Sequence, residues 1–88
     1  MAALRLPTPE VLAVVEGTLR RLGWVRQDLL DAMAERFGGK PDSYDRRLRR
    51  AQARGTIDLD LADVLLEALD RTLNDVPSYH DLPLGAAA

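Results

Sequence analysis

The sequence contains no cysteine and a single histidine, His80. Without cysteine, the chain can form neither a disulfide nor a thiolate metal site. The only carboxylate close to His80 in the sequence is Asp81, whereas a metal site or a catalytic triad requires more partners. We therefore expect His80 to be a loop side chain packed against Tyr79. We also expect a protein that is not an enzyme and has no cofactor.

Long hydrophobic runs are also missing. No apolar stretch approaches the roughly 20 residues that cross a bilayer, and residues 1–7 lack the sustained hydrophobic segment of a secretion signal. We therefore expect a cytoplasmic protein that does not bind a membrane. The 88 residues are 47% hydrophobic and 30% charged, which is the composition of a folded protein with too few side chains for two cores. The prediction is a single helical domain over residues 1–88.

Strand-like alternation is limited to the five residues 57–61, after which the pattern becomes helical, and no internal repeat is present. Four segments instead show the helical spacing of apolar residues, and glycines or prolines follow them. The predicted helices span residues 8–22, 24–37, 43–54 and 58–70. The tail, residues 76–88, is interrupted by Pro77 and Pro83, and its end is expected to fray. The predicted fold class is all-α, a compact bundle of four to five helices.

Residues at the expected helix starts suit those positions. Thr8 is predicted to cap the first helix, with Pro9 at its first position, and Asp42 or Ser43 to cap the third. Trp24 is predicted to open the second helix and to pack between the first two. The expected buried faces contain, in chain order, Val11, Val15, Thr18, Leu19 and Leu22; Val25, Leu29, Leu30, Met33 and Phe37; Tyr44, Leu48 and Ala51; and Leu61, Ala62, Leu65, Leu66, Ala68 and Leu69.

Charge is distributed unevenly, although the net charge is only −2. Residues 56–75 contain one arginine against six acidic side chains, whereas residues 42–55 contain five arginines. These are Arg46, Arg47, Arg49, Arg50 and Arg54. Guanidinium groups bind both guanine edges and phosphates, so the segment suits contact with a nucleic acid. The alternative is a solvated face whose arginines pair with Asp42, Asp45 or the later acidic helix.

Three segments carry a family resemblance. Residues 27–33, Gln-Asp-Leu-Leu-Asp-Ala-Met, open with two polar residues and a leucine; residues 43–55 form an arginine helix that ends in glycine; residues 59–69 run from Leu-Asp to Ala-Leu. Together they resemble the supporting, recognition and following helices of the lambda-repressor-like helix-turn-helix family, with a longer connection between the first two. The resemblance implies a helix-turn-helix unit at residues 27–55. It further implies site-specific binding to double-stranded DNA by a small transcriptional regulator, of the phage or mobile-element type.

The resemblance also implies roles, because the N-terminal part of a recognition helix approaches base edges in the major groove. The residues expected to read bases are Ser43, Asp45, Arg46, Arg47 and Arg50. The residues expected to contact backbone phosphates are Gln27, Lys40, Arg49 and Arg54. A single recognition helix reads few base pairs, so we expect a homodimer, formed through Val14 on the first helix or through residues 76–84 of the tail.

Two other functions fit the same residues. An antitoxin- or inhibitor-like protein-interaction module would bind a protein partner through the acidic helix, residues 60–70, and the apolar tail. An architectural DNA-binding factor in recombination would use the same arginines but would bend DNA and select bases weakly. Substituting Arg46 and Arg50 tests DNA binding, and substituting Asp63 and Glu67 tests the protein-interaction alternative.

Overall fold

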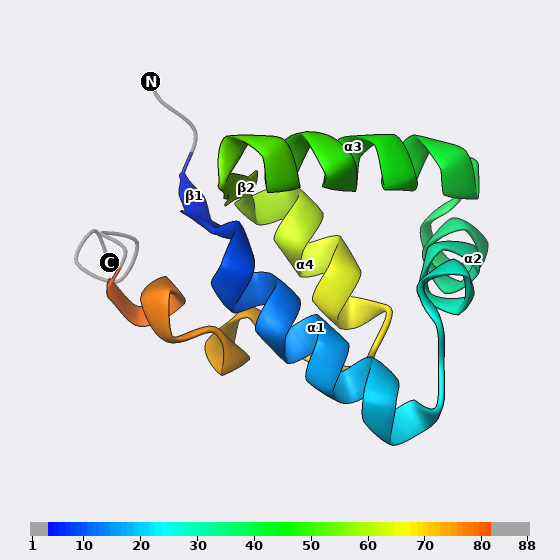
Figure 1. Cartoon of the computed structure of the whole chain (residues 1–88), viewed down its shortest axis with the longest axis horizontal. Coiled ribbons are helices and arrows are strands. Elements are labelled where there is room, and N and C mark those ends of the chain that lie inside the picture. The colour runs from blue at the N-terminus through cyan, green and yellow to red at the C-terminus, as the bar shows by residue number, and fades with distance from the viewer. Residues whose placement is uncertain (1–3, 82–88) are drawn as a thin grey trace.

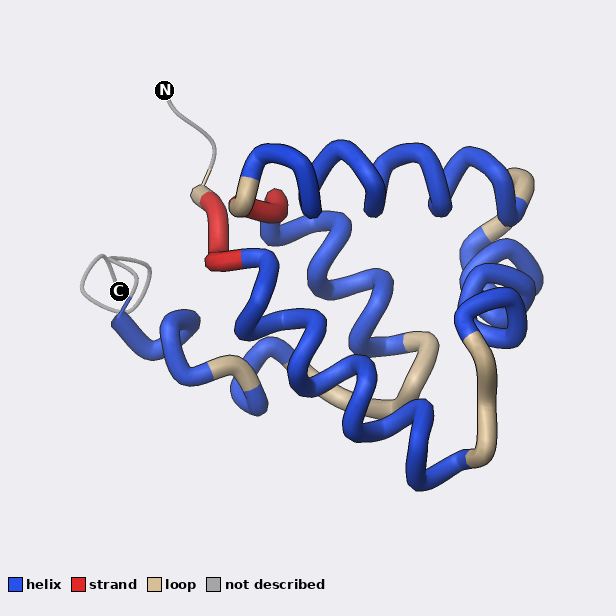
Figure 2. The backbone as a smooth tube through the Cα atoms, in the orientation of Figure 1, coloured by secondary structure: helices blue, strands red, loops and turns tan. Residues whose placement is uncertain are grey.

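The computed structural model describes residues 4–81, and its four α-helices pack together with a pair of short antiparallel strands at one end of the molecule, where the first and fourth helices begin and the third ends (Figures 1 and 2). The main elements, in chain order, are β1 (Arg5–Pro7), α1 (Thr8–Leu22), α2 (Arg26–Phe37), α3 (Pro41–Arg54), β2 (Thr56–Asp58) and α4 (Leu59–Glu67). Two short 3-10 helices, η1 (Leu73–Asp75) and η2 (Pro77–Asp81), complete the described chain. The predicted, mostly helical fold is confirmed. The bundle comprises four α-helices within residues 4–81, so a fifth α-helix is not seen there.

For the first three helices, the ends agree with the prediction better than the starts do, whereas α4 ends at Glu67 and not at residue 70 as predicted. Leu22, Phe37 and Arg54 are each followed by a glycine, as expected. At the starts, Pro7 rather than Thr8 occupies the N-cap position of α1, and Pro9 is the second helical residue. Likewise α2 begins at Arg26 rather than Trp24, and α3 begins at Pro41, with Lys40 at the N-cap.

The predicted side-chain caps of α1 and α3 are therefore wrong. Ser43 lies inside the first turn of α3, and no side chain caps that helix. The Thr8 hydroxyl instead donates a hydrogen bond of 2.8 Å to the Ala51 carbonyl oxygen on α3. Thr8 is buried, so its hydroxyl needs an internal partner, and a carbonyl group of another helix provides it. This bond connects the start of α1 to the end of α3.

The strand pair was not predicted. Leu6 of β1 lies opposite Ile57 of β2, and both side chains are fully buried. Arg5 and Asp58 form the neighbouring pair, with 3.1 Å between Nε and Oδ1. Each strand has only three residues, which is too short for an alternating pattern to be recognised. The pairing depends on residues about fifty positions apart, so tertiary contact decides it.

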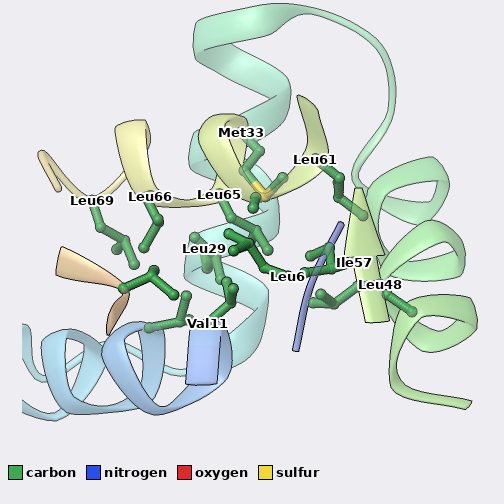
Figure 3. Close-up of a cluster of buried hydrophobic side chains, with 14 of the residues drawn as sticks. Leu6, Val11, Leu29, Met33, Leu48, Ile57, Leu61, Leu65, Leu66 and Leu69 are labelled. Carbon is green, nitrogen blue, oxygen red and sulfur yellow. The ribbon is translucent and has the colours of Figure 1, made fainter. Parts of the chain in front are cut away.

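One hydrophobic core joins the helices, the strands and the tail. Figure 3 shows Leu6, Ile57 and Leu65 packed together between the surrounding helices. Most of the predicted buried positions are confirmed, and Trp24 packs on the edge of the core near the α1–α2 junction. Three predictions are wrong: Leu22, Val25 and Phe37 are 49%, 65% and 38% exposed. All three lie at a helix terminus or just before one. At these positions the apolar spacing of the sequence continues, but neighbouring elements cover the side chains only in part.

The tail folds back onto α1. Val76 is fully buried, and the Ser78 hydroxyl and backbone N–H both donate hydrogen bonds to the Glu10 carboxylate. His80 lies edge-on to Tyr79, as expected, but it belongs to η2 and not to a loop, and its Nε2 is 2.9 Å from the Asn74 carbonyl oxygen. The predicted fraying falls on residues 85–88, which lie outside the described part of the chain. Of the described helices, none combines the length and apolar character that a bilayer-spanning helix requires.

Candidate nucleic-acid interface

Helix α3 lies along one edge of the molecule, with α2 near its N-terminal end and α4 near its C-terminal end (Figure 1). Leu48 and Ala51 are buried and hold one side of α3 against the core. The Tyr44 hydroxyl donates a 2.7 Å hydrogen bond to the Gly38 carbonyl oxygen, which ties α3 to the α2–α3 turn. Because these contacts come from one side of α3, the opposite side of the helix remains accessible.

The accessible side carries the five arginines that the sequence analysis assigned to nucleic-acid contact, and all five are exposed. Within residues 4–81, four of them have no carboxylate oxygen within 4.0 Å: Arg46, Arg47, Arg50 and Arg54. Arg46 is 200° from Leu48 on an ideal helix and is therefore at the crest of the exposed side. Internal pairing, the alternative explanation for this cluster, accounts for only one of its members, Arg49.

Asp45 is the partner of Arg49. Its two oxygens are engaged separately: Oδ2 accepts a 2.8 Å hydrogen bond from Arg49 Nε, and Oδ1 accepts a 3.0 Å hydrogen bond from Arg26 Nε. These hydrogen bonds, first that of Arg49 and then that of Arg26, lower the pKa of Asp45 below its usual value of 3.8. Asp45 therefore acts as an anchor between α2 and α3. Arg26 was not among the predicted residues, because its partner lies 19 positions away and leaves no local pattern.

The remaining predicted residues lie at the starts of α3 and α2. Lys40 and Ser43 are exposed at the N-cap and in the first turn. Gln27 is exposed in the first turn of α2, where its Nε2 donates a 2.9 Å hydrogen bond to Asp31 Oδ1. The structure thus places seven of the nine predicted side chains on α3, with Lys40 at its N-cap and Gln27 in the first turn of α2. Asp45 and Arg49 differ from the others in being paired with each other.

A concavity of about 140 Å³ lies beside the C-terminal half of α3. It is lined by Arg47, Arg50, Arg54, Asp58 and Leu61. The arginines come from one flank of α3, and the other two residues come from β2 and α4. Asp58 is the residue whose carboxylate pairs with Arg5, so it does not compensate all three arginines. This flank of α3 therefore places three exposed arginines around one hollow.

The acidic face of α4 interacts with α2 and not with the arginines of α3. Arg36 Nη1 donates a 2.7 Å hydrogen bond to the Glu67 carbonyl oxygen, and its Nη2 lies 3.6 Å from Glu67 Oε1. Asp70 is 3.5 Å from Arg36 Nη1. Arg36 therefore engages the C-terminal end of this acidic face, whereas Asp60 and Asp63 remain exposed. The two ends of α2 carry the arginines that join it to α3 and α4.

A larger concavity of about 370 Å³ lies between α1 and the end of α3. Its lining is Thr8, Pro9, Leu12, Ala13, Glu16, Gln52 and Gly55. Glu16 is the only titratable side chain in that lining, so this hollow offers a mainly apolar surface and no pair of groups for acid–base chemistry. Its position away from the arginines makes it separate from the candidate interface.

Comparison with known proteins leaves the function to be inferred from these features. The sequence matches no model of a protein family, and neither a curated protein nor a solved structure is significantly similar to it.

Proposed function

We propose that this protein binds double-stranded DNA in a site-specific manner through the exposed side of α3 and acts as a small transcriptional regulator. The observation that carries the proposal is the set of four exposed α3 arginines without a carboxylate partner among residues 4–81. Like charges three or four positions apart destabilise a helix, whereas phosphates and guanine edges would compensate this repulsion. The basic surface is local, which suits a protein whose net charge is −2.

The dimensions of α3 support insertion into the major groove. A helix with its side chains is about 10–12 Å wide, and the groove is about 12 Å wide. The 14 residues of α3 would extend roughly 21 Å. Arg46 at the crest is the best-placed side chain for bidentate bonds to guanine, with Ser43 beside the same end of the helix. Lys40, at the N-cap of α3, and Gln27, in the first turn of α2, would contact backbone phosphates.

The α2–α3 arrangement supports a helix-turn-helix mode of binding. The contact between these two helices is the most extensive between any pair of elements, and Figure 1 shows α2 almost end-on while α3 lies across the view. Residues 38–40 form the connection. Because one recognition helix reads only a few base pairs, a regulator of this kind would act as a homodimer on two half-sites.

Selection from a randomised duplex pool tests the proposal, followed by titration of the selected and scrambled duplexes at two salt concentrations. We expect a two-part motif whose half-sites are about one helical turn, 10 base pairs, apart. Arg46→Ala should reduce the preference for the selected duplex by about 1–3 kcal/mol. The matched control is Arg21→Ala, an exposed arginine at the far end of α1. Full retention of sequence preference in a folded Arg46→Ala protein would contradict the assignment.

The same titration separates the proposal from its alternatives. Equal and strongly salt-dependent binding to both duplexes would indicate an architectural factor. The interactions of α4 count against an acidic docking surface, because Arg36 engages the side chains of Glu67 and Asp70. Asp60→Ala with Asp63→Ala is consequently a cleaner test of that alternative than a change at Glu67, and we expect it to leave DNA binding intact.

A further inference from the structure

We propose that the concavity lined by Arg47, Arg50 and Arg54 is a phosphate-binding site. This inference rests on the proposed DNA-binding function for one point, namely that the phosphate belongs to the DNA backbone. Whether the site binds a phosphate anion at all can be tested independently. It assigns to Arg47 and Arg50 a positioning role in place of the base-reading role expected from the sequence.

Charge supports this assignment. Arg47, Arg50 and Arg54 are separated by three and four positions, so their guanidinium groups lie on one flank of α3 and repel one another. The single carboxylate in the lining, Asp58, lies 3.1 Å from a fourth arginine, Arg5. The hollow and its surroundings are therefore positive, and a bound phosphate anion would relieve the repulsion. Guanidinium groups bind phosphate oxygens through pairs of charge-assisted hydrogen bonds.

The size of the hollow restricts its ligand. Sites for drug-sized molecules and cofactors have volumes of about 300–1,000 Å³, whereas this concavity measures about 140 Å³. A single phosphate group is compatible with that volume, but a whole nucleotide would extend outside it. Leu61 contributes the only apolar side chain of the lining, so the polar surface is arginine with one carboxylate.

The location of the site explains how it would serve DNA binding. Asp45, Arg49 and Arg26 occupy the flank of α3 that faces the start of α2, whereas the concavity lies on the flank that faces β2 and α4. When a helix enters the major groove, its two flanks face the two backbone strands. Arg46 at the crest would then read bases, and the three arginines of the concavity would clamp one backbone.

The first experiment titrates the intact wild-type protein with inorganic phosphate, at constant ionic strength maintained with chloride. The Nε–Hε signals of the arginines are followed by NMR. We expect saturable shifts at Arg47, Arg50 and Arg54, and only small linear changes at Arg20 and Arg21 of α1. Shifts that are linear and equal at all these arginines would overturn the proposal, because they would show general screening.

The second experiment identifies the source of the phosphate by comparing Arg50→Ala/Arg54→Ala with Arg46→Ala. If the DNA backbone is the source, the double variant should bind selected and scrambled duplexes more weakly by the same factor, and the salt slope should fall by about 1 for each arginine removed. An unchanged slope together with saturable phosphate shifts would identify a small free phosphate compound as the ligand. Saturable shifts in a wild-type protein that binds no duplex would support the site and refute the proposed function.

Discussion

The carboxylate of Asp45 accepts hydrogen bonds from Arg49 on its own helix and from Arg26 on the preceding one. Both oxygens of Asp45 therefore already have partners within the protein. A contact between Asp45 and the amino group of a cytosine, as a base-reading role would require, would compete with these two hydrogen bonds. At the scale of single residues, this is the largest change that tertiary structure makes to the candidate site. The arginine cluster was evident from the sequence, but which arginine is paired was not.

The pKa of Asp45 should be measurably lower than 3.8 in the folded protein, because Arg49 and then Arg26 stabilise the ionised form. A lowered folded-state pKa means that ionised Asp45 stabilises the fold above the unfolded value of about 3.9 and that this contribution is lost as pH falls through the folded value. Carboxyl-carbon NMR titration measures it. Arg49→Ala should raise the pKa, whereas Arg50→Ala, the neighbouring exposed arginine, should change it much less. A midpoint at 3.8 or above would contradict the pairing.

Leu48→Ala should destabilise the protein by about 2–5 kcal/mol, because truncating a buried leucine removes transfer free energy and leaves a cavity. Leu48 is only 2% exposed, as its spacing with Ala51 predicted. Urea denaturation measures the loss. Leu22→Ala is the matched control, since the same atoms are removed from a side chain that is 49% exposed, and its cost should be clearly smaller. Equal costs would mean that α3 is oriented differently.

At the scale of elements, glycines decide where the helices end and the following segments begin. Gly55 has φ of +85° and its N–H donates to the Ala51 carbonyl oxygen, so the chain can leave α3 and pair immediately as β2. This left-handed conformation is strained for a residue with a Cβ atom. The sequence predicted the stop, whereas the strand that follows it required a partner from the other end of the chain.

Gly55→Ala should therefore destabilise the protein by about 1–2 kcal/mol, through backbone strain alone, because no atom lies within 4 Å of the added Cβ. Gly17→Ala is the control with the opposite expected sign. Gly17 lies within α1 and its added Cβ also meets nothing within 4 Å, so alanine should stabilise the helix by up to about 1 kcal/mol. Thermal and urea denaturation of both variants measure the difference. Equal effects of the two substitutions would contradict this assignment of strain.

At the scale of the whole molecule, the tail completes the core. Val76 is fully buried, and Ser78 binds Glu10 in the first turn of α1. The sequence had suggested that residues 76–84 could form a dimer or partner surface because they are unusually apolar. The structure explains the apolar residue at position 76 differently, because Val76 is buried in the core of its own chain. The other surface suggested for dimerisation includes Val14, which is half-buried against the core.

Val76→Ala should destabilise the folded protein by roughly 2 kcal/mol, because it removes two buried methyl groups and leaves a small cavity. Val25→Ala makes the same chemical change at a side chain that is 65% exposed, so it should cost much less. The free energies of unfolding in urea provide the comparison. If Val76→Ala changed only self-association and left unfolding unaffected, the tail would be a partner surface after all.

The sequence by itself determined the four helical segments, most of their buried faces and the arginine helix, because helical spacing and glycine stops are encoded within each segment. Tertiary structure decided the β1–β2 pair, the Thr8–Ala51 bond, the anchoring of Asp45 by Arg26, and the hollow beside Arg47. These features join residues that are 43 positions apart in the case of Thr8 and Ala51, and 19 in the case of Arg26 and Asp45. Local periodicity carries no information about such contacts, which depend on how the elements pack.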